Sequence, residues 1–92
     1  MLHELKILPE YYDAVANDIK TFEIRENDRN YSVGDTLWLR EFDKDDIYQS
    51  EWATHTRYTG KECFAVITYI LNLKDFLNID EDYVALGIKV RK

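Results

Sequence analysis

Apolar and polar side chains alternate with period two in several short segments of this 92-residue chain, and this pattern constrains the fold most. Such alternation is typical of a β-strand with one buried face. It predicts strands at residues 2–7, 20–26, 36–42 and 84–90. A parallel sheet would need long crossovers between its strands, and the sequence has room for one sizeable helix only. We therefore expect a mainly β (α+β) fold: a small curled sheet or barrel, mostly antiparallel, with one principal helix packed at an end.

The remaining elements follow from local signals. A helix is expected from about residue 9 to residue 17, because Pro9 suits the first helical turn. One face of that helix would carry Leu8, Tyr12, Val15, Ala16 and Ile19. Residues 63–71 are apolar on both faces and predict a central strand, and residues 73–78 a brief helical turn. Residues 43–62 are the least regular and are expected to close with a turn at 58–61.

Length and composition indicate one domain over residues 1–92. The single cysteine, Cys63, excludes an internal disulfide and a cysteine-based zinc site, and its apolar surroundings predict a small buried hydrophobe. We expect no metal, no cofactor and no membrane span, since no apolar run approaches the ~20 residues that a spanning helix needs. The N-terminal residues lack the pattern of a secretory signal, so a cytoplasmic protein is expected.

The net charge of −6 disfavours loose, sequence-independent binding to nucleic acid, which depends on a basic surface. A nucleic-acid site on this chain would have to be a local basic patch on an acidic body. Its expected members are Lys6, Lys20, Arg25, Arg29 and Lys61.

The segment 20–29 is the strongest candidate for a site. Phe22 and Ile24 are expected to point into the core, which would place Thr21, Glu23 and Arg25 together on the opposite face. At roughly 3.3 Å per residue, Glu23 and Arg25 would lie about 7 Å apart along the strand. A turn-forming run, residues 27–30, follows directly. A rigid strand would thus present a dense polar cluster at its edge.

These side chains suit a nucleotide-like ligand. Arg25 and Arg29 offer planar forks for phosphate or a base edge, and Asn27 can pair its amide with a base. Glu23 could accept a hydrogen bond from an exocyclic amine or orient Arg25. Lys20 could contact phosphate or act as a base. The alternative is that the pairs Glu23–Arg25 and Asp28–Arg29 are surface ion pairs worth at most about 1 kcal/mol each.

The segment 18–25 resembles the G-x-K-x-x-E-x-R signature of ASCH domains, which belong to the PUA-like superfamily, with Lys20, Glu23 and Arg25 matching and Asp18 in place of the glycine. The chain more closely resembles the family of small bacterial and phage proteins described as DUF3850. That resemblance runs through residues 3–6, Pro9, 20–29, 33–35, 39–41, 58–61 and 67–71. Residues 45–57 look like an insertion in a loop of the family.

The resemblance implies a PUA-like barrel and a role in RNA binding, so the leading hypothesis is an RNA-binding module that holds a nucleotide or structured RNA in a cleft. Some small ASCH proteins are amidohydrolases of an acylated cytidine, which gives a first alternative with Lys20 and Glu23 as catalytic residues. An accessory protein that binds a protein partner through its acidic face is the second alternative. The expected ligand-binding residues are His3, Lys6, Lys20, Glu23, Arg25, Asn27, Asp28, Arg29, Tyr58 and Lys61.

The histidines and the loop aromatics carry alternatives. His3 could join Lys6 at the edge of the cleft or be a satisfied structural histidine. Trp52 and Tyr58 are candidate stacking platforms for a base, although exposed loop aromatics often have no such role. His55 is expected to be solvated, and neither histidine has other metal ligands near it in the sequence.

Overall fold

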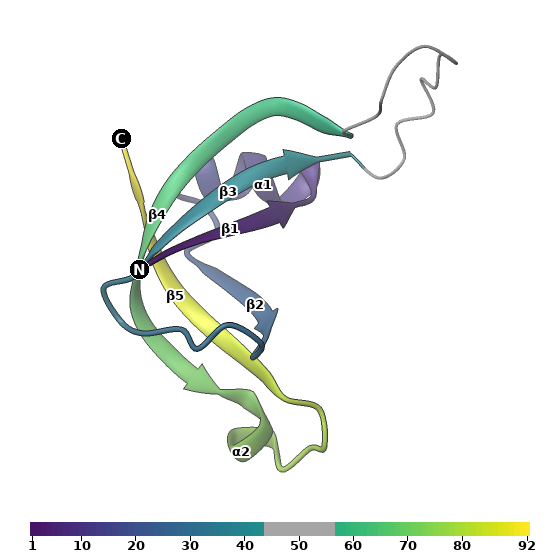
Figure 1. The fold of residues 1–92 in the computed structure, drawn as a ribbon, viewed down its shortest axis with the longest axis vertical. Coiled ribbons are helices and arrows are strands. Elements are labelled where there is room, and N and C mark those ends of the chain that lie inside the picture. Colours follow the sequence, from purple (N-terminus) through teal and green to yellow (C-terminus); the bar gives the residue numbers. More distant parts are fainter. Residues whose placement is uncertain (44–56) are drawn as a thin grey trace.

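A computed structural model of the chain describes residues 1–43 and 57–92. The elements, in chain order, are β1 (Leu2–Ile7), α1 (Pro9–Ala16), β2 (Phe22–Glu26), β3 (Thr36–Phe42), β4 (Tyr58–Asn72), α2 (Leu73–Leu77) and β5 (Tyr83–Arg91). The five strands form one sheet in the order β1-β3-β4-β5-β2, and Figure 1 shows that this sheet is strongly curled. Strand β1 pairs parallel with β3, and the other pairings are antiparallel. The predicted fold class, a mainly β curled sheet, is confirmed.

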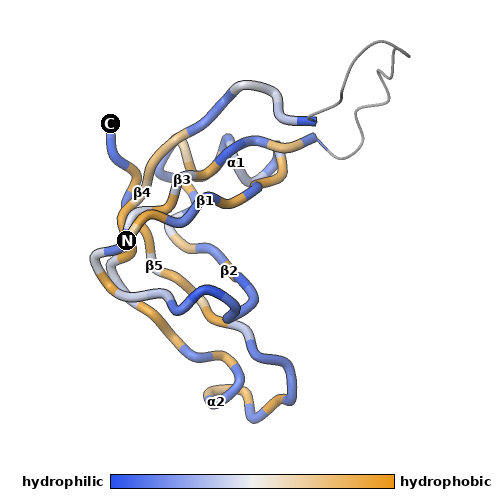
Figure 2. Tube along the Cα trace, viewed as in Figure 1, coloured by the Kyte–Doolittle hydropathy of each residue, from blue (hydrophilic) through white to orange (hydrophobic). Residues whose placement is uncertain are grey.

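The core lies on the inner face of the curled sheet. Alternate residues of β1, β3, β4 and β5 are buried there, and α1 adds Tyr12 and Val15. The buried strand residues are Leu5, Ile7, Leu37, Leu39, Ala65, Ile67, Val84, Leu86 and Ile88. Figure 2 shows the alternation along β1 and β3 and the more continuous hydrophobic character of β5. Periodicity alone thus locates most of the core.

Cys63 lies on the edge of this core. It is half-buried and packs against the buried cluster, as its apolar surroundings predict. Burial, and secondarily the Glu23 carboxylate, raises the pKa of its thiol. A raised pKa keeps the thiol protonated and unreactive at neutral pH.

The expected orientation of β2 is wrong. Phe22 and Ile24 are each 47% exposed, whereas Glu23 is only 4% exposed. The register with β5 explains the inversion, because Glu23 lies opposite the buried Leu86 and Arg25 lies opposite the buried Val84. Directly opposed residues share a face of the sheet. The long apolar face of β5 therefore decides which side of its short neighbour turns inward.

Two local predictions are also wrong. The segment 58–61 is not a turn but the start of β4, although Gly60 keeps a left-handed φ of 95° within it. Ile19 does not extend the buried face of α1 and is 79% exposed. The helix ends at Ala16 and Asp18 adopts a φ of 60°, so Ile19 leaves the helical register. Trp52 and His55 lie outside the described residues.

Candidate functional site

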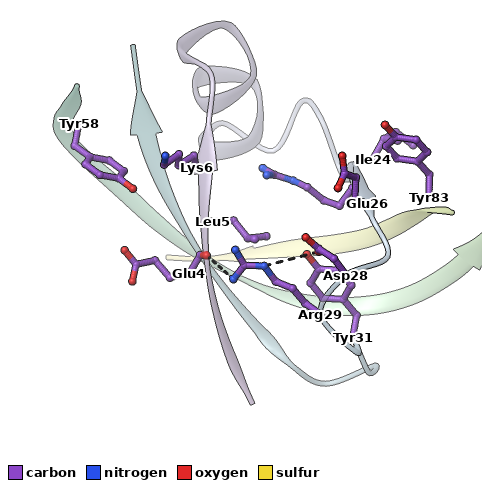
Figure 3. Close-up of a pocket in the computed structure, with 11 residues that line it drawn as sticks. Glu4, Leu5, Lys6, Ile24, Glu26, Asp28, Arg29, Tyr31, Tyr58 and Tyr83 are labelled. Atoms are coloured by element: carbon purple, nitrogen blue, oxygen red, sulfur yellow. Dashed lines mark hydrogen bonds and ion pairs between the residues drawn. The ribbon is translucent and has the colours of Figure 1, made fainter. Parts of the chain in front are cut away.

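A pocket of about 720 Å³ lies in the gap that the curled sheet leaves between its two edge strands, β1 and β2. We call it the edge pocket. Its lining residues come from both edges, from the loop after β2, and from the first residues of β4 and β5 (Figure 3). They are Glu4, Leu5, Lys6, Ile24, Arg25, Glu26, Asp28, Arg29, Tyr31, Tyr58 and Tyr83. A sheet that stops short of closing thus leaves a polar cavity between its edges.

The chain caps both open edges with its own cations. On β2, the Lys20 ammonium donates to the backbone carbonyl of Phe22 at 2.6 Å. On β1, the Arg29 guanidinium donates through Nη1 to the backbone carbonyl of Glu4 at 2.9 Å. Unpaired edge groups invite pairing with another strand, and charged side chains on an edge oppose it. The two capping bonds therefore oppose the addition of another strand at either edge and help to keep the gap between the edges open.

A buried carboxylate supports the β2 wall of the pocket. Lys20 Nζ donates to Glu23 Oε2 at 2.9 Å, and Arg25 Nη2 lies 3.8 Å from Glu23 Oε1. Glu23 Oε1 is buried and accepts no hydrogen bond from any residue that the structure describes. The two cations compensate the charge of Glu23 on the mainly apolar inner face. Glu23 therefore restrains Arg25, which lines the pocket while Glu23 does not.

The charges of the edge pocket are balanced. Three cations, Lys6, Arg25 and Arg29, face three carboxylates, Glu4, Glu26 and Asp28. Several of these charges are already engaged. Glu4 accepts a hydrogen bond from Arg40 at 2.7 Å, and this bond raises the pKa of Arg40. Asp28 lies 4.0 Å from Arg29, and Lys6 Nζ lies 4.6 Å from the centre of the Phe42 ring. Within the described residues Glu26 makes no ion pair. A bare phosphate gains little from such a balanced site, but a ligand with donors and acceptors can use both signs.

Three tyrosines line the pocket from different sides. Tyr31, Tyr58 and Tyr83 line the pocket and come from three separate segments (Figure 3). Among the described residues, the buried Tyr31 hydroxyl has no hydrogen-bond partner, and burial raises its pKa. An unpaired buried hydroxyl is costly, because folding removes its hydrogen bonds to water and supplies none in return. Tyr58 is held edge-on to Phe42, with the ring centres 5.3 Å apart.

His3 packs against Tyr31 and does not line the pocket. It is buried, its Nε2 lies 2.9 Å from Asp35 Oδ2, and its ring packs edge-on to Tyr31 at 4.8 Å between centres. Asp35 also accepts from the N-terminal ammonium at 3.0 Å and from the Ser32 backbone N–H. These bonds, led by that from His3, lower the pKa of Asp35 to about 2. The geometry matches the structural alternative for His3.

A smaller acidic pocket, about 360 Å³, adjoins the edge pocket. It is lined by Glu26, Asn27, Asp28, Glu81, Asp82 and Tyr83. Asn27 is engaged there, because its Nδ2 donates to Asp82 Oδ1 at 3.2 Å. Within residues 1–43 and 57–92, no group of three or more histidine, cysteine, aspartate or glutamate side chains could hold a metal ion. In the same residues, no helix is long and apolar enough to cross a membrane.

The structure therefore divides the residues predicted from the sequence. Those that line the edge pocket are Lys6, Arg25, Asp28, Arg29 and Tyr58, and those that do not are His3, Lys20, Glu23, Asn27 and Lys61. Lys20 and Glu23 act behind the wall, and Lys61 is exposed on β4. Sequence reasoning missed Glu4, Leu5, Ile24, Glu26, Tyr31 and Tyr83. The outward position of Glu4 beside Lys6 was a usable signal, because both belong to the same face of an edge strand.

The fold and the pocket define a small single-sheet protein with an open, charged and tyrosine-lined cavity between its edge strands. The chain belongs to the family described as "Domain of unknown function (DUF3850)", whose sequence profile matches residues 2–88. It is 39% identical over 85 residues to the "Uncharacterized 12.9 kDa protein in GpA 3'region" of Escherichia phage P2. The match covers 92% of this chain but only 65% of the phage protein. The expected membership of DUF3850 is thus confirmed.

Proposed function

We propose that this protein binds RNA by holding one nucleotide in the edge pocket. The observation that carries the proposal is the convergence of three cations and three tyrosines, from segments far apart in the chain, on one open cavity. At about 720 Å³ the cavity falls within the range of small-molecule sites, roughly 300–1,000 Å³. The resemblance of residues 18–25 to the ASCH signature supports the same function.

Each group of lining residues has a role in this proposal. Tyr31, Tyr58 or Tyr83 offers a ring for stacking an unpaired base, as in most sequence-specific RNA recognition. Arg25 and Arg29 offer forks that suit phosphate oxygens. Asp28, which lines the pocket 4.0 Å from Arg29, offers an acceptor for the N–H groups of a base.

The balanced charge of the pocket reconciles RNA binding with an acidic chain. A chain with a net charge of −6 repels the phosphate backbone at long range, so general binding to RNA is weak. Contacts inside one pocket still favour a nucleotide that can be splayed out of its strand. The proposed ligand is therefore a single-stranded or looped segment, and a perfect duplex binds more weakly.

Fluorescence anisotropy tests the proposal directly. Short single-stranded RNAs of each base composition, a hairpin and a duplex are titrated with the wild-type protein at several salt concentrations. Arg25→Ala is expected to weaken binding by about tenfold or more, the loss of one charge-assisted hydrogen bond. Lys61→Ala is the matched control, because Lys61 is a cation outside the pocket. The affinity of this variant for RNA should stay near that of the wild type. Equal binding by both variants, or no binding to any RNA, overturns the proposal.

The hydrolase alternative receives no comparable support. A general base needs a free electron pair, but the Lys20 nitrogen donates both to the Phe22 carbonyl and to Glu23. Neither Lys20 nor Glu23 lines the edge pocket or the acidic pocket. We therefore assign the pair to positioning and do not propose a reaction.

A further inference from the structure

Two rows of apolar or small residues cross the outer face of the sheet over β4, β5 and β2. The strand register places Tyr69, Gly87 and Phe22 in one row and Leu71, Ala85 and Ile24 in the next. We call this surface the outer apolar face. None of the six side chains is charged. The core lies on the opposite side of the sheet.

Three of the six side chains on this face are exposed, whereas Leu71 and Ala85 are half-buried. Tyr69 is 64% exposed, and Phe22 and Ile24 are each 47% exposed. If a fully buried aromatic side chain removes 150–250 Å² from water, the two rings alone expose about 200 Å². Contiguous apolar patches of a few hundred Å² on a soluble protein often mark interaction sites. The face therefore suits the centre of an interface.

The shape of the face suits a flat partner. Its middle column consists of Gly87 and Ala85, so a shallow trough runs between the larger side chains of β4 and β2. A side chain at position 87 would crowd this trough, because an added Cβ would lie 3.2 Å from Thr68 Oγ1 and 3.3 Å from Tyr69 Cβ. A second sheet of the same shape could pack face to face on this surface, with its larger side chains on either side of the trough.

The charges at the two ends of the face select the partner. Lys89 follows Gly87 on the same side of β5, beyond the aromatic row, and Glu26 follows Ile24 on β2, beyond the aliphatic row. A two-fold axis in the plane of the face, running across the strands, exchanges these ends. Lys89 of one copy then approaches Glu26 of the other, and each aromatic row meets an aliphatic row. An axis along the strands would instead set Lys89 against Lys89.

We propose that the outer apolar face is the interface of a homodimer with its two-fold axis across the strands. The partner is a second copy because one surface carries both members of the complementary charge pair. The apolar rows supply only part of the roughly 800 Å² per partner of a standard interface, so the neighbouring outer residues of the sheet form the rim. A dimer of this size is concentration-dependent.

Analytical ultracentrifugation of the whole chain over a wide concentration range tests the proposal. The wild type should pass from monomer to dimer. Tyr69→Glu should raise the dimer dissociation constant by about tenfold or more, because it buries a charge at the centre of the interface. Leu2→Glu is the matched control, since Leu2 is 55% exposed on β1, which β3 separates from β4, and this variant should dimerise as the wild type does. A wild type that stays monomeric at all concentrations overturns the proposal, as does a Tyr69→Glu protein that dimerises normally.

A charge exchange tests the direction of the axis and does not depend on the folding of Tyr69→Glu. Lys89→Glu should weaken the dimer, because it sets glutamates against each other at both ends of the face. Adding Glu26→Lys should restore the affinity, since the charge pairs are re-formed in reverse. Failure of the double variant to recover overturns the proposed axis. Circular dichroism confirms that each variant is folded before its association is measured.

Discussion

Removing the Lys20 ammonium should destabilise the protein through the buried carboxylate that it contacts. At an effective dielectric constant of 20, a 2.9 Å pair corresponds to about 6 kcal/mol of gross attraction and a 3.8 Å pair to about 4 kcal/mol. In Lys20→Met, Glu23 keeps only the weaker attraction to Arg25. Breaking a buried pair on one side typically costs 3–5 kcal/mol. Since Arg25 remains, we expect a loss of about 2–3 kcal/mol in the free energy of unfolding.

Urea unfolding followed by circular dichroism measures this loss, with Glu23→Gln and the double variant Lys20→Met/Glu23→Gln as controls. Neutralising Glu23 removes the reason for the penalty, so the double variant should be more stable than Lys20→Met alone. If Lys20→Met unfolds within about 0.5 kcal/mol of the wild type, the range of an ordinary surface substitution, the compensation argument is wrong. A double variant less stable than Lys20→Met would contradict it equally.

Three further predictions test other parts of the fold. The pKa of Asp35 is lowered from 3.8 to about 2, so its carboxylate contributes stability above pH 4 that is lost as the pH falls towards 2. Thermal unfolding across this range should show a smaller pH dependence for Asp35→Asn than for the wild type, and identical slopes would contradict the assignment. Gly34 has a φ of 95° with open space around it, so Gly34→Ala should cost about 1 kcal/mol in urea unfolding from backbone strain alone. Leu37 is fully buried, and Leu37→Ala should cost about 2–5 kcal/mol by the same measurement, whereas a smaller loss would indicate a core that collapses around the cavity.

The sequence predicted most of the sheet because the pattern within each strand was long enough to be unambiguous. Alternation located β1 and β3 to the residue, and the apolar run 63–71 identified β4 as a central strand. Segments with mixed signals were less predictable. The glycine at position 60 suggested a turn, but a left-handed φ occurs there inside a strand.

The composition of the site was harder to predict, because pockets depend on register and on the ends of strands. Alternation divides β2 into two faces but does not say which face turns inward. Tyr83 reaches the pocket because β5 pairs it with Glu26, and no local pattern reveals that pairing. Tyr31 reaches it from the loop after β2, where side-chain direction has no period to follow.

The position of β2 at the edge explains both the failed orientation and the existence of the site. A buried carboxylate is costly unless a cation lies beside it. Among the described strands, only β5 lies beside β2, and the open side of β2 admits Lys20, which reaches back to Glu23. This access makes an inward-facing Glu23 and Arg25 tolerable. The same open side places Arg25 at the pocket, so the residues that stabilise the edge also supply its binding groups.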